Sequence, residues 1–187
     1  MTKSKWAQMY ASRVGDSYPA YVAQQYRPFL DIITQVTQPN DTVIEAGCGI
    51  GTITKIISRE THSANYKAFD KDMAQVMLTE QNLKDIHNVQ WIGQGDILDP
   101  LMYRSADVIH SHGVLEHFDD RTIARVLGHQ QESGARALVH YVPLEGWVTG
   151  SYGDERLLSP DHWQRIHKPT DIVLFNENKD AALVWIL

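Results

Sequence analysis

The sequence has 187 residues, a length that suits one domain with a buried core rather than two domains. Hydrophobic residues make up 43% and charged residues 21% of the chain, as in an ordinary globular protein, and no apolar run approaches the ~18 residues of a membrane span. The formal net charge of −6 does not attract phosphate backbones, so a nucleic-acid partner is not expected.

The N-terminal stretch, residues 1–14, carries basic side chains but no continuous apolar core. It therefore does not predict a secretory signal, and a cytoplasmic setting is expected. Cys48 is the lone cysteine and cannot form a disulfide within the chain. Its place between two glycines predicts a small packed side chain rather than a reactive thiol.

Two helices are predicted before residue 39. Apolar residues recur at steps of three and four between Trp6 and Val14, which predicts a short amphipathic helix. A second helix is predicted to begin near Pro28, which suits a first helical turn, and to end before the turn residues 39–41.

The chain then enters a glycine-rich turn. A β-branched run from Thr42 predicts a strand that reaches the acidic Glu45, and Gly47, Gly49 and Gly51 follow at steps of two. Glycines allow positive φ and a close approach of backbone to ligand, and the helix after them presents free N–H groups. The stretch therefore predicts a turn that binds a nucleotide or a nucleotide-like cofactor.

Strands and helices alternate after this turn. Further strands are predicted over residues 66–70, 89–92, 106–110 and 137–142. A strand, a helix and a second strand form the βαβ unit, and its repetition predicts a doubly wound parallel sheet.

The helices between these strands have recognisable starts. One is predicted from Asp72, and another is capped by Asp119 or Asp120. The side chains that the first of these helices is expected to bury are Met73, Val76, Met77 and Leu83.

The pattern loosens toward the C-terminus. Residues 143–160 predict a loop or lid, and Ser159 predicts the start of a further helix. Apolar runs at 172–175 and 181–187 flank polar residues that suit a turn, which predicts an antiparallel hairpin.

Polar side chains gather at the carboxyl ends of the predicted parallel strands. Glu45 follows the first strand, Asp70 ends the second, Asp96 follows the third, and Ser111 and His112 follow the fourth. Ligands of open parallel sheets bind beyond these ends, so one crevice is predicted to collect all of them.

Each of these residues has a second interpretation. Asp70 follows Gly51 by close to the ~20 residues at which a dinucleotide fold places a carboxylate on the ribose hydroxyls, although it could instead cap the next helix. Met73 could cover an adenine face or pack in the core. Asp96 could accept an exocyclic amine, with Ile97 beside the base, or bond to its own loop backbone.

Together these segments resemble one family. Residues 43–52, Val-Ile-Glu-Ala-Gly-Cys-Gly-Ile-Gly-Thr, look like motif I of the class I methyltransferases that use S-adenosylmethionine. The resemblance continues in chain order. The acid at the end of that family's second strand matches Asp70, its adenine loop matches residues 95–97, and the segment after its fourth strand matches residues 113–118. The resemblance covers roughly residues 40–143, and the terminal hairpin resembles the family's sixth and seventh strands.

The resemblance implies a fold and a cofactor. The fold is a Rossmann-like, doubly wound α/β sheet of seven mostly parallel strands with a C-terminal antiparallel hairpin and helices on both faces. Glu45 would orient the turn and the amine of the methionine part. The glycines would lie alongside that methionine part, and Asp70 and Asp96 would hold the ribose and the adenine. The predicted cofactor-binding residues are Glu45, Gly47, Cys48, Gly49, Gly51, Asp70, Lys71, Met73, Asp96, Ile97 and Ser111.

Other cofactors and roles fit these residues less well. A NAD-binding fingerprint needs G-x-G-x-x-G, and Thr52 stands where its third glycine would fall. A phosphate-binding P-loop would need Gly-Lys-Ser/Thr, which is missing from the turn. A NAD-dependent oxidoreductase is thus the weaker rival, and a non-catalytic S-adenosylmethionine-binding module or partner subunit is the main alternative to an enzyme.

Three histidines lie near the fourth strand. His110, His112 and His117 match no zinc-ligand spacing, and no metal is predicted. Positioning alone can supply much of the rate of methyl transfer, so a base is optional. His112 and Tyr141 are the catalytic candidates, His140 is a further possible base, and a histidine satisfied by loop backbone is the plain alternative.

The acceptor is expected to be a small molecule. The Asp/Asn-Pro-Pro-aromatic motif of DNA amino-methyltransferases is missing after the fourth strand, where residues 111–114 stand. The resemblance places helices from residues 1–38 and the loop 143–160 over the acceptor side of a single domain, residues 1–187. Aromatic residues there line an acceptor pocket or pack in the core: Trp6, Tyr10, Tyr18, Trp147 and Tyr152. The oligomeric state stays open.

Overall fold

The computed structural model describes residues 8, 10, 13, 17–147 and 154–187. The helix predicted between Trp6 and Val14 lies largely outside the described residues, as does Tyr152. None of the helices in the described ranges combines the length and the apolar character that a membrane crossing needs.

The centre of the fold is a seven-stranded mixed sheet in the order β3-β2-β1-β4-β5-β7-β6. The strands are β1 (Thr42–Ala46), β2 (Asn65–Asp70), β3 (Val89–Gln94), β4 (Val108–His112), β5 (Ala137–Pro143), β6 (Asp171–Phe175) and β7 (Asp180–Ile186). The first five pair in parallel, and β7 runs antiparallel to both β5 and β6. The expected mostly parallel sheet with a C-terminal antiparallel hairpin is confirmed.

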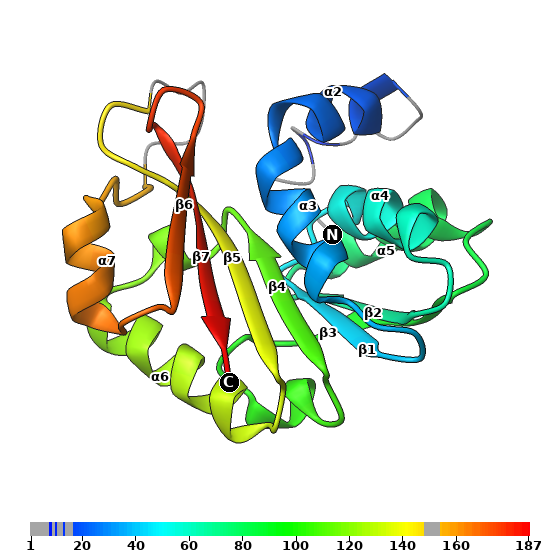
Figure 1. Cartoon of the computed structure of the whole chain (residues 1–187). Coiled ribbons are helices and arrows are strands. Elements are labelled where there is room, and N and C mark those ends of the chain that lie inside the picture. Colours follow the sequence, from blue (N-terminus) through cyan, green and yellow to red (C-terminus); the bar gives the residue numbers. More distant parts are fainter. Residues whose placement is uncertain (1–7, 9, 11–12, 14–16, 148–153) are drawn as a thin grey trace.

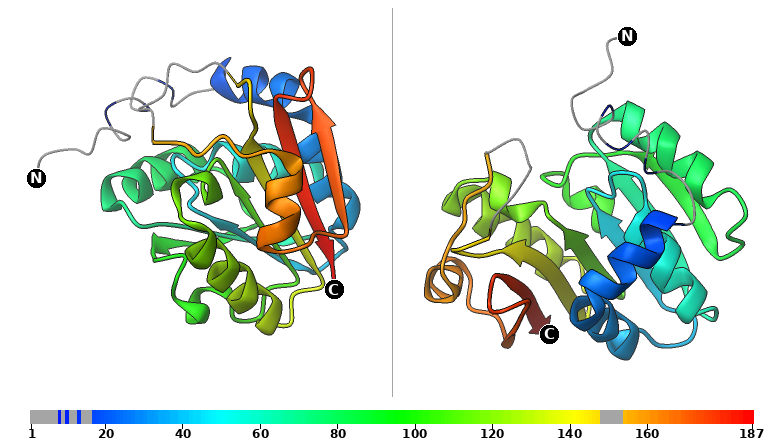
Figure 2. Two further views of the ribbon diagram at one scale, coloured as in Figure 1. Left: turned by 90° about the vertical axis from the view of Figure 1, so that its left-hand side faces the viewer. Right: turned by 90° about the horizontal axis from the view of Figure 1, so that it is seen from above.

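Helices cover both faces of the sheet. In Figure 1 the sheet passes between α6 and α7 on the left and α2 to α5 on the right, and Figure 2 gives two further views. The helices and short 3-10 turns are α2 (Ser17–Gln25), α3 (Arg27–Val36), α4 (Thr52–Glu60), α5 (Met73–Leu83), η2 (Pro100–Tyr103), η3 (Leu115–His117), α6 (Asp120–Glu132) and α7 (Pro160–Ile166). Each face has its own apolar core, one around Phe29 and Ile57 and the other around Ile123 and Trp163.

Capping residues set the helix starts. Asp72 accepts a hydrogen bond from the Ala74 N–H at 2.9 Å and begins α5. Asp119, rather than Asp120, caps α6 by accepting from the Thr122 N–H. Ser159 caps α7. These side chains satisfy helix N–H groups that have no intrahelical partner.

Two sequence expectations were wrong in detail. Met73 and Met77 are not buried on α5, because the exposed fractions of these side chains are 44% and 64%. The fourth strand runs from Val108 to His112, two residues later than expected, so Ser111 and His112 belong to the strand itself. The sequence also gave no signal for α2, which precedes α3 directly.

The reversal of strand order falls between β1 and β4. The strands β2 and β3 continue the sheet on one side of this pair, and β5 continues it on the other. A crevice forms outside the carboxyl ends of strands where the order reverses, because the connections leave in opposite directions. The fold therefore places the turn after β1 beside the end of β4.

Candidate donor and acceptor site

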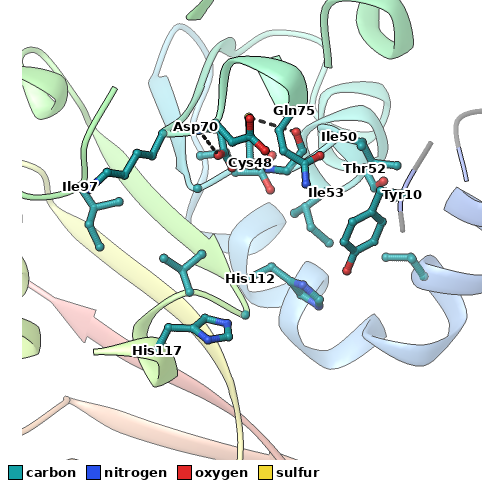
Figure 3. Close-up of a pocket in the computed structure, with 18 of the residues that line it drawn as sticks. Tyr10, Cys48, Ile50, Thr52, Ile53, Asp70, Gln75, Ile97, His112 and His117 are labelled. Carbon is teal, nitrogen blue, oxygen red and sulfur yellow. Dashed lines mark hydrogen bonds between the residues drawn. The ribbon is translucent and has the colours of Figure 1, made fainter. Parts of the chain in front are cut away.

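A cavity of about 350 Å³ lies at the carboxyl ends of these strands. Figure 3 shows His112 and His117 on the side of this cavity opposite Asp70, Cys48 and Gln75. The predicted residues that line it are Glu45, Gly47, Cys48, Gly49, Asp70, Lys71, Asp96, Ile97 and His112. Four different strands thus contribute to one site, as the sheet topology requires.

The turn between β1 and α4 forms one wall. Gly47, Gly49 and Gly51 all have positive φ, which glycine adopts without steric cost. A Cβ on Gly51 would lie 2.7 Å from the Thr79 side chain, so this glycine allows α4 and α5 to pack closely. A Cβ on Gly49 would meet nothing within 4 Å, because this glycine faces the cavity.

Glu45 connects β1 to the first turn of α4. One carboxylate oxygen, Oε2, accepts hydrogen bonds from the Thr54 backbone N–H at 3.1 Å and from its hydroxyl at 2.5 Å. Burial raises the pKa of Glu45 to about 8, although the bonds from Thr54 oppose the shift. Glu45 thus holds the start of α4 in place and also lines the cavity.

Asp70 connects the end of β2 to the glycine turn. Its Oδ2 accepts from the Gly49 N–H and its Oδ1 from the Asp72 N–H, both at 2.9 Å. A carboxylate has about four acceptor positions, so acceptor capacity remains for a ligand hydroxyl. Burial raises the pKa of Asp70, while hydrogen bonds from the backbone of Asp72, Gly49 and Lys71 oppose the shift.

Asp96 and Lys71 form an ion pair at the edge of the cavity. Lys71 Nζ lies 3.0 Å from Asp96 Oδ2, and Asp96 Oδ1 accepts from the Leu98 N–H at 3.0 Å. The bond from Leu98 is the main reason that the pKa of Asp96 is lowered, and Lys71 adds to the effect. Asp96 therefore stays anionic at neutral pH.

His112 lies in an aromatic setting. Its ring stacks on Tyr141, with centroids 4.3 Å apart and planes 16° apart, and meets the edge of Tyr26 at 4.4 Å. The surrounding protein desolvates the ring and lowers the pKa of His112 to about 3. Within the described ranges, its Nε2 has no hydrogen-bond partner. The imidazole is therefore neutral near pH 7, and its Nε2 is buried and unpaired in the described part of the chain.

Four predicted residues lie outside the lining of this cavity. Gly51 packs between α4 and α5, and Met73 is exposed on α5. Ser111 points to the opposite face of the sheet, where its hydroxyl lies 2.8 Å from His140 Nδ1. Tyr141 lies behind His112, and its hydroxyl donates to Asp180 at 2.8 Å.

The sequence did not reveal several lining residues. Gln75 is buried on α5, and its Oε1 has no partner among the described residues. Its sequence neighbours carry no signal, because a polar residue in the first turn of a helix usually faces solvent. Tyr10 and Tyr18, which the sequence offered as acceptor-side aromatic residues, line this cavity too. The other lining residues outside the predicted binding set are Val22, Ile50, Thr52, Ile53, Asp72, Gly113, Val114, His117, Phe118 and Asp154.

A second cavity of about 530 Å³ adjoins the first. The two share the lining residues Tyr10, Tyr18, His112, Gly113 and His117. The rest of the second cavity is lined by Arg13, Tyr21, Tyr26, Glu116, Tyr141, Pro143, Trp147 and Glu155. His112 therefore lies between the strand-end cavity and a cavity with mainly aromatic walls.

The other histidines take structural positions. His110 is fully buried against Phe29, with ring centroids 6.4 Å apart. His140 bonds to Gln130 as well as to Ser111, and burial lowers its pKa to about 3. His117 Nδ1 lies 3.2 Å from Asp154 Oδ1 at the cavity mouth. His110 and His112 do not converge with His117 on a common point.

The sequence was also compared with models of known protein families and with known proteins. Residues 44–132, a little under half of the chain, match a family model described as a methyltransferase domain. No curated protein matches the sequence.

Solved structures share the fold at low sequence identity. The protein PH0226 from Pyrococcus horikoshii OT3 has a TM-score of 0.72 at 11% identity, covering 92% of both chains. Magnesium protoporphyrin IX methyltransferase from Synechocystis PCC 6803, with S-adenosylhomocysteine bound, has a TM-score of 0.66 at 15% identity, covering 96% of this chain and 91% of that one. The CurJ carbon methyltransferase has a TM-score of 0.67 at 18% identity, covering 95% of this chain. The chain spans 56% of the length of CurJ and 60% of the pyocyanin biosynthetic protein PhzM.

The cavity fits the cofactor of this family. Its volume lies in the range of small-molecule sites. The bare backbone at Gly49 leaves room for a ligand, and the remaining acceptor capacity of Asp70 suits a ribose diol. The acidic lining, Asp70 and Asp96 with the carboxyl group of Glu45 beside them, suits a cationic ligand without phosphates. Residues 44–132 are thus similar to a methyltransferase domain, and the lining of the cavity suits S-adenosylmethionine.

Proposed function

We propose that the protein transfers the methyl group of S-adenosylmethionine to a small-molecule acceptor. The observation that supports this is the pair of adjoining cavities, because a transferase must hold donor and acceptor side by side. S-adenosylmethionine supplies a methyl group activated by a positively charged sulfur. The cytoplasmic setting expected from the sequence stays part of the proposal.

The first cavity is the proposed donor site. Asp70 holds the ribose hydroxyls through its remaining acceptor capacity, and Asp96 and Ile97 hold the adenine. Glu45 and the turn from Gly47 to Gly49 hold the methionine part. The ion pair between Lys71 and Asp96 closes the outer edge of the adenine position.

The second cavity is the proposed acceptor site. Besides the ends of β4 and β5, its described walls include side chains from the N-terminal segment, such as Tyr21 and Tyr26, and from the segment after β5, Trp147 and Glu155. We therefore propose that these segments cover the acceptor side of a single domain.

His112 and Tyr141 are poor general bases in this arrangement. A pKa of about 3 leaves His112 with little tendency to take a proton at neutral pH. Burial raises the pKa of Tyr141, whose hydroxyl already donates to Asp180. Their proposed role is to shape the junction of the two cavities and to position the acceptor.

The test begins with ligand binding. S-adenosylhomocysteine should raise the melting temperature of the protein, whereas NADH should not. A larger shift with NADH would favour the oxidoreductase instead. Incubation of S-adenosylmethionine with a broad panel of small acceptors should then form S-adenosylhomocysteine. Tight binding without turnover of any acceptor would favour the non-catalytic module.

A further inference from the structure

We propose that the acceptor carries an amino group, which Glu116 binds and deprotonates inside the aromatic second cavity. This inference rests on the proposed function, since it assigns the chemistry of the acceptor to that same site. The carboxyl of Glu116 and the rings around it carry the argument.

Glu116 is a buried acid with which no lysine or arginine pairs among the described residues; the one ionisable partner there is His117. Only 3% of the residue is exposed, yet it lines the second cavity. Its Oε2 has no hydrogen-bond partner in the described part of the chain, and its Oε1 lies 3.9 Å from His117 Nε2, beyond hydrogen-bond distance. A buried carboxylate is costly unless it is paired and hydrogen-bonded, so a cation that arrives with the ligand would stabilise the charged form of Glu116.

The position of Glu116 is fixed by the backbone around it. It lies in η3, directly after the end of β4, and its carbonyl oxygen accepts from the Arg156 N–H at 2.9 Å. Its Oε1 would lie 3.3 Å from a Cβ on Gly113, which lines both cavities. The carboxyl therefore lies at the junction, where the acceptor nitrogen must meet the methyl group.

The rings of the second cavity suit a cation. Tyr18, Tyr21, Tyr26, Tyr141 and Trp147 line it, and the faces of such rings attract ammonium groups. Arg13 already demonstrates this preference at the mouth, because its guanidinium lies 5.0 Å from the ring centre of Tyr10 and 5.3 Å from that of Tyr18. The inner rings and Glu116 have no such cation among the described residues.

The protonation of Glu116 agrees with this role. Burial raises the pKa of its carboxyl to about 8, and the nearby carboxylates of Glu155 and Asp154 add to the shift. Near neutral pH the carboxyl is thus mostly protonated in the empty cavity. An ammonium group lowers this pKa again, because an adjacent positive charge favours the carboxylate. A neutral hydroxyl acceptor would bring no such charge.

The chemical step balances without a further reagent. The carboxylate of Glu116 takes one proton from the bound ammonium group and leaves a neutral amine with a free electron pair. The nitrogen forms a bond to the methyl carbon while the bond from that carbon to sulfur breaks, and the electron pair of that bond stays on sulfur. The positive charge moves to the methylated nitrogen, and Glu116 later releases its proton to water.

The experiment compares matched ligands in the presence of S-adenosylhomocysteine. Each pair has one carbon skeleton with an amine or a hydroxyl: benzylamine and benzyl alcohol, phenethylamine and 2-phenylethanol, tryptamine and tryptophol. Calorimetry on the wild-type protein should give at least one amine a tenfold or greater advantage in affinity over its alcohol. Repetition in buffers of different ionisation enthalpy at pH 7 should detect proton release when that amine binds.

The variant Glu116→Gln tests the residue itself. It should reduce the amine advantage to threefold or less and abolish proton release, while the affinity for S-adenosylhomocysteine stays unchanged. Glu132→Gln is the matched control, because Glu132 is exposed on α6, away from both cavities. Mass spectrometry should find the methyl group on the nitrogen of the bound amine when S-adenosylmethionine is supplied.

Several results would overturn the proposal. They are equal affinity for amines and alcohols, an amine advantage that survives in Glu116→Gln, and the failure of every amine to bind a protein that binds S-adenosylhomocysteine. Failure to bind S-adenosylhomocysteine would instead reject the proposed function, and the amine proposal with it. The wild-type comparison does not depend on the folding of the variant.

Discussion

The carboxylate of Asp70 accepts a hydrogen bond from the backbone N–H of Gly49 at 2.9 Å, joining the end of β2 to the turn after β1. The same side chain accepts from the N–H of Asp72, which caps α5. One acid therefore sets the shape of the glycine turn and faces the proposed ribose position. Its binding role and its structural role are inseparable.

Replacement of Asp70 by asparagine should weaken S-adenosylhomocysteine binding by 10- to 100-fold. The loss corresponds to about 1.5–3 kcal/mol for a hydrogen bond to a charged group. The melting temperature should fall as well, since an amide cannot accept at both of its ends. Calorimetric titration and thermal unfolding measure the two effects. Asp171→Asn is the control at an exposed position on β6, and unchanged affinity in Asp70→Asn would remove Asp70 from the site.

Alanine substitutions should separate the two functions of the glycine turn. Gly51→Ala should destabilise the fold by about 2–4 kcal/mol, because the residue has a φ of 71° and its Cβ would clash with Thr79. Gly49→Ala should cost only the ~1–2 kcal/mol of its positive φ but should weaken S-adenosylhomocysteine binding at least tenfold, because its Cβ would enter the cavity.

The control for these variants is Gly134→Ala. Gly134 also has a positive φ and open space around it, but it lies after α6 and does not line either cavity. Gly134→Ala should lose about as much stability as Gly49→Ala does, but its affinity for S-adenosylhomocysteine should not change. Chemical denaturation and calorimetry measure these quantities. Equal binding by the Gly49 and Gly134 variants would contradict the proposed position of the ligand.

Buried histidines should make the protein sensitive to acid. The pKa of His110 falls from 6.5 to about 3, chiefly because of burial. Between these values the unfolded chain binds more protons than the folded one, so stability is lost as the pH drops below about 6.5. His110→Leu removes one such group and should move the midpoint of acid unfolding to lower pH.

Acid titration followed by circular dichroism measures that midpoint. His87→Leu is the control, since His87 is exposed. An equal midpoint in the wild-type protein and His110→Leu would show that this histidine does not drive acid unfolding.

Glu45 should make stability depend on pH in the opposite direction to His110. Its pKa is raised from 4.5 to about 8 in the folded state, so the folded protein binds more protons than the unfolded chain in this window. The contribution of Glu45 to stability therefore declines as the pH rises from about 4.5 to about 8, by up to ~1.4 kcal/mol per pH unit. Glu45→Gln should have a shallower decline than the wild-type protein in urea denaturation from pH 5 to 9. The exposed Glu80→Gln should keep the wild-type slope.

Local sequence signals predicted most of the fold. Alternating apolar runs indicated the strands, and Asp72, Ser159 and Pro28 indicated helix starts, because each acts on neighbours within a few residues. The failures have a common cause. Met73 and Met77 are apolar residues in a helix, but α5 buries the face that carries Gln75, Val76 and Leu83, so both methionines lie on its exposed side.

In the candidate site too, some residues could be predicted from local sequence signals and others could not. Glu45, Asp70 and Asp96 could be named from the sequence because each stands at the end of a predicted strand, and parallel strands bring their ends together. Gln75 could not be named, since its place in the lining depends on how α5 packs. Tyr18 was expected only among the aromatic residues of the acceptor side, but it lines both cavities. Ser111 was placed at the crevice, but strand alternation turns it to the other face.

The sequence by itself determined the glycine turn, the order of strands and helices, and the acids at the strand ends, because these follow from local backbone preferences and the period of burial. Tertiary structure alone decided that Oε2 of Glu116 is buried with no hydrogen-bond partner in the described part of the chain, that His112 stacks on Tyr141, and that a second, aromatic cavity adjoins the first. Burial, desolvation and cavity shape arise from residues far apart in the chain, so no local pattern encodes them.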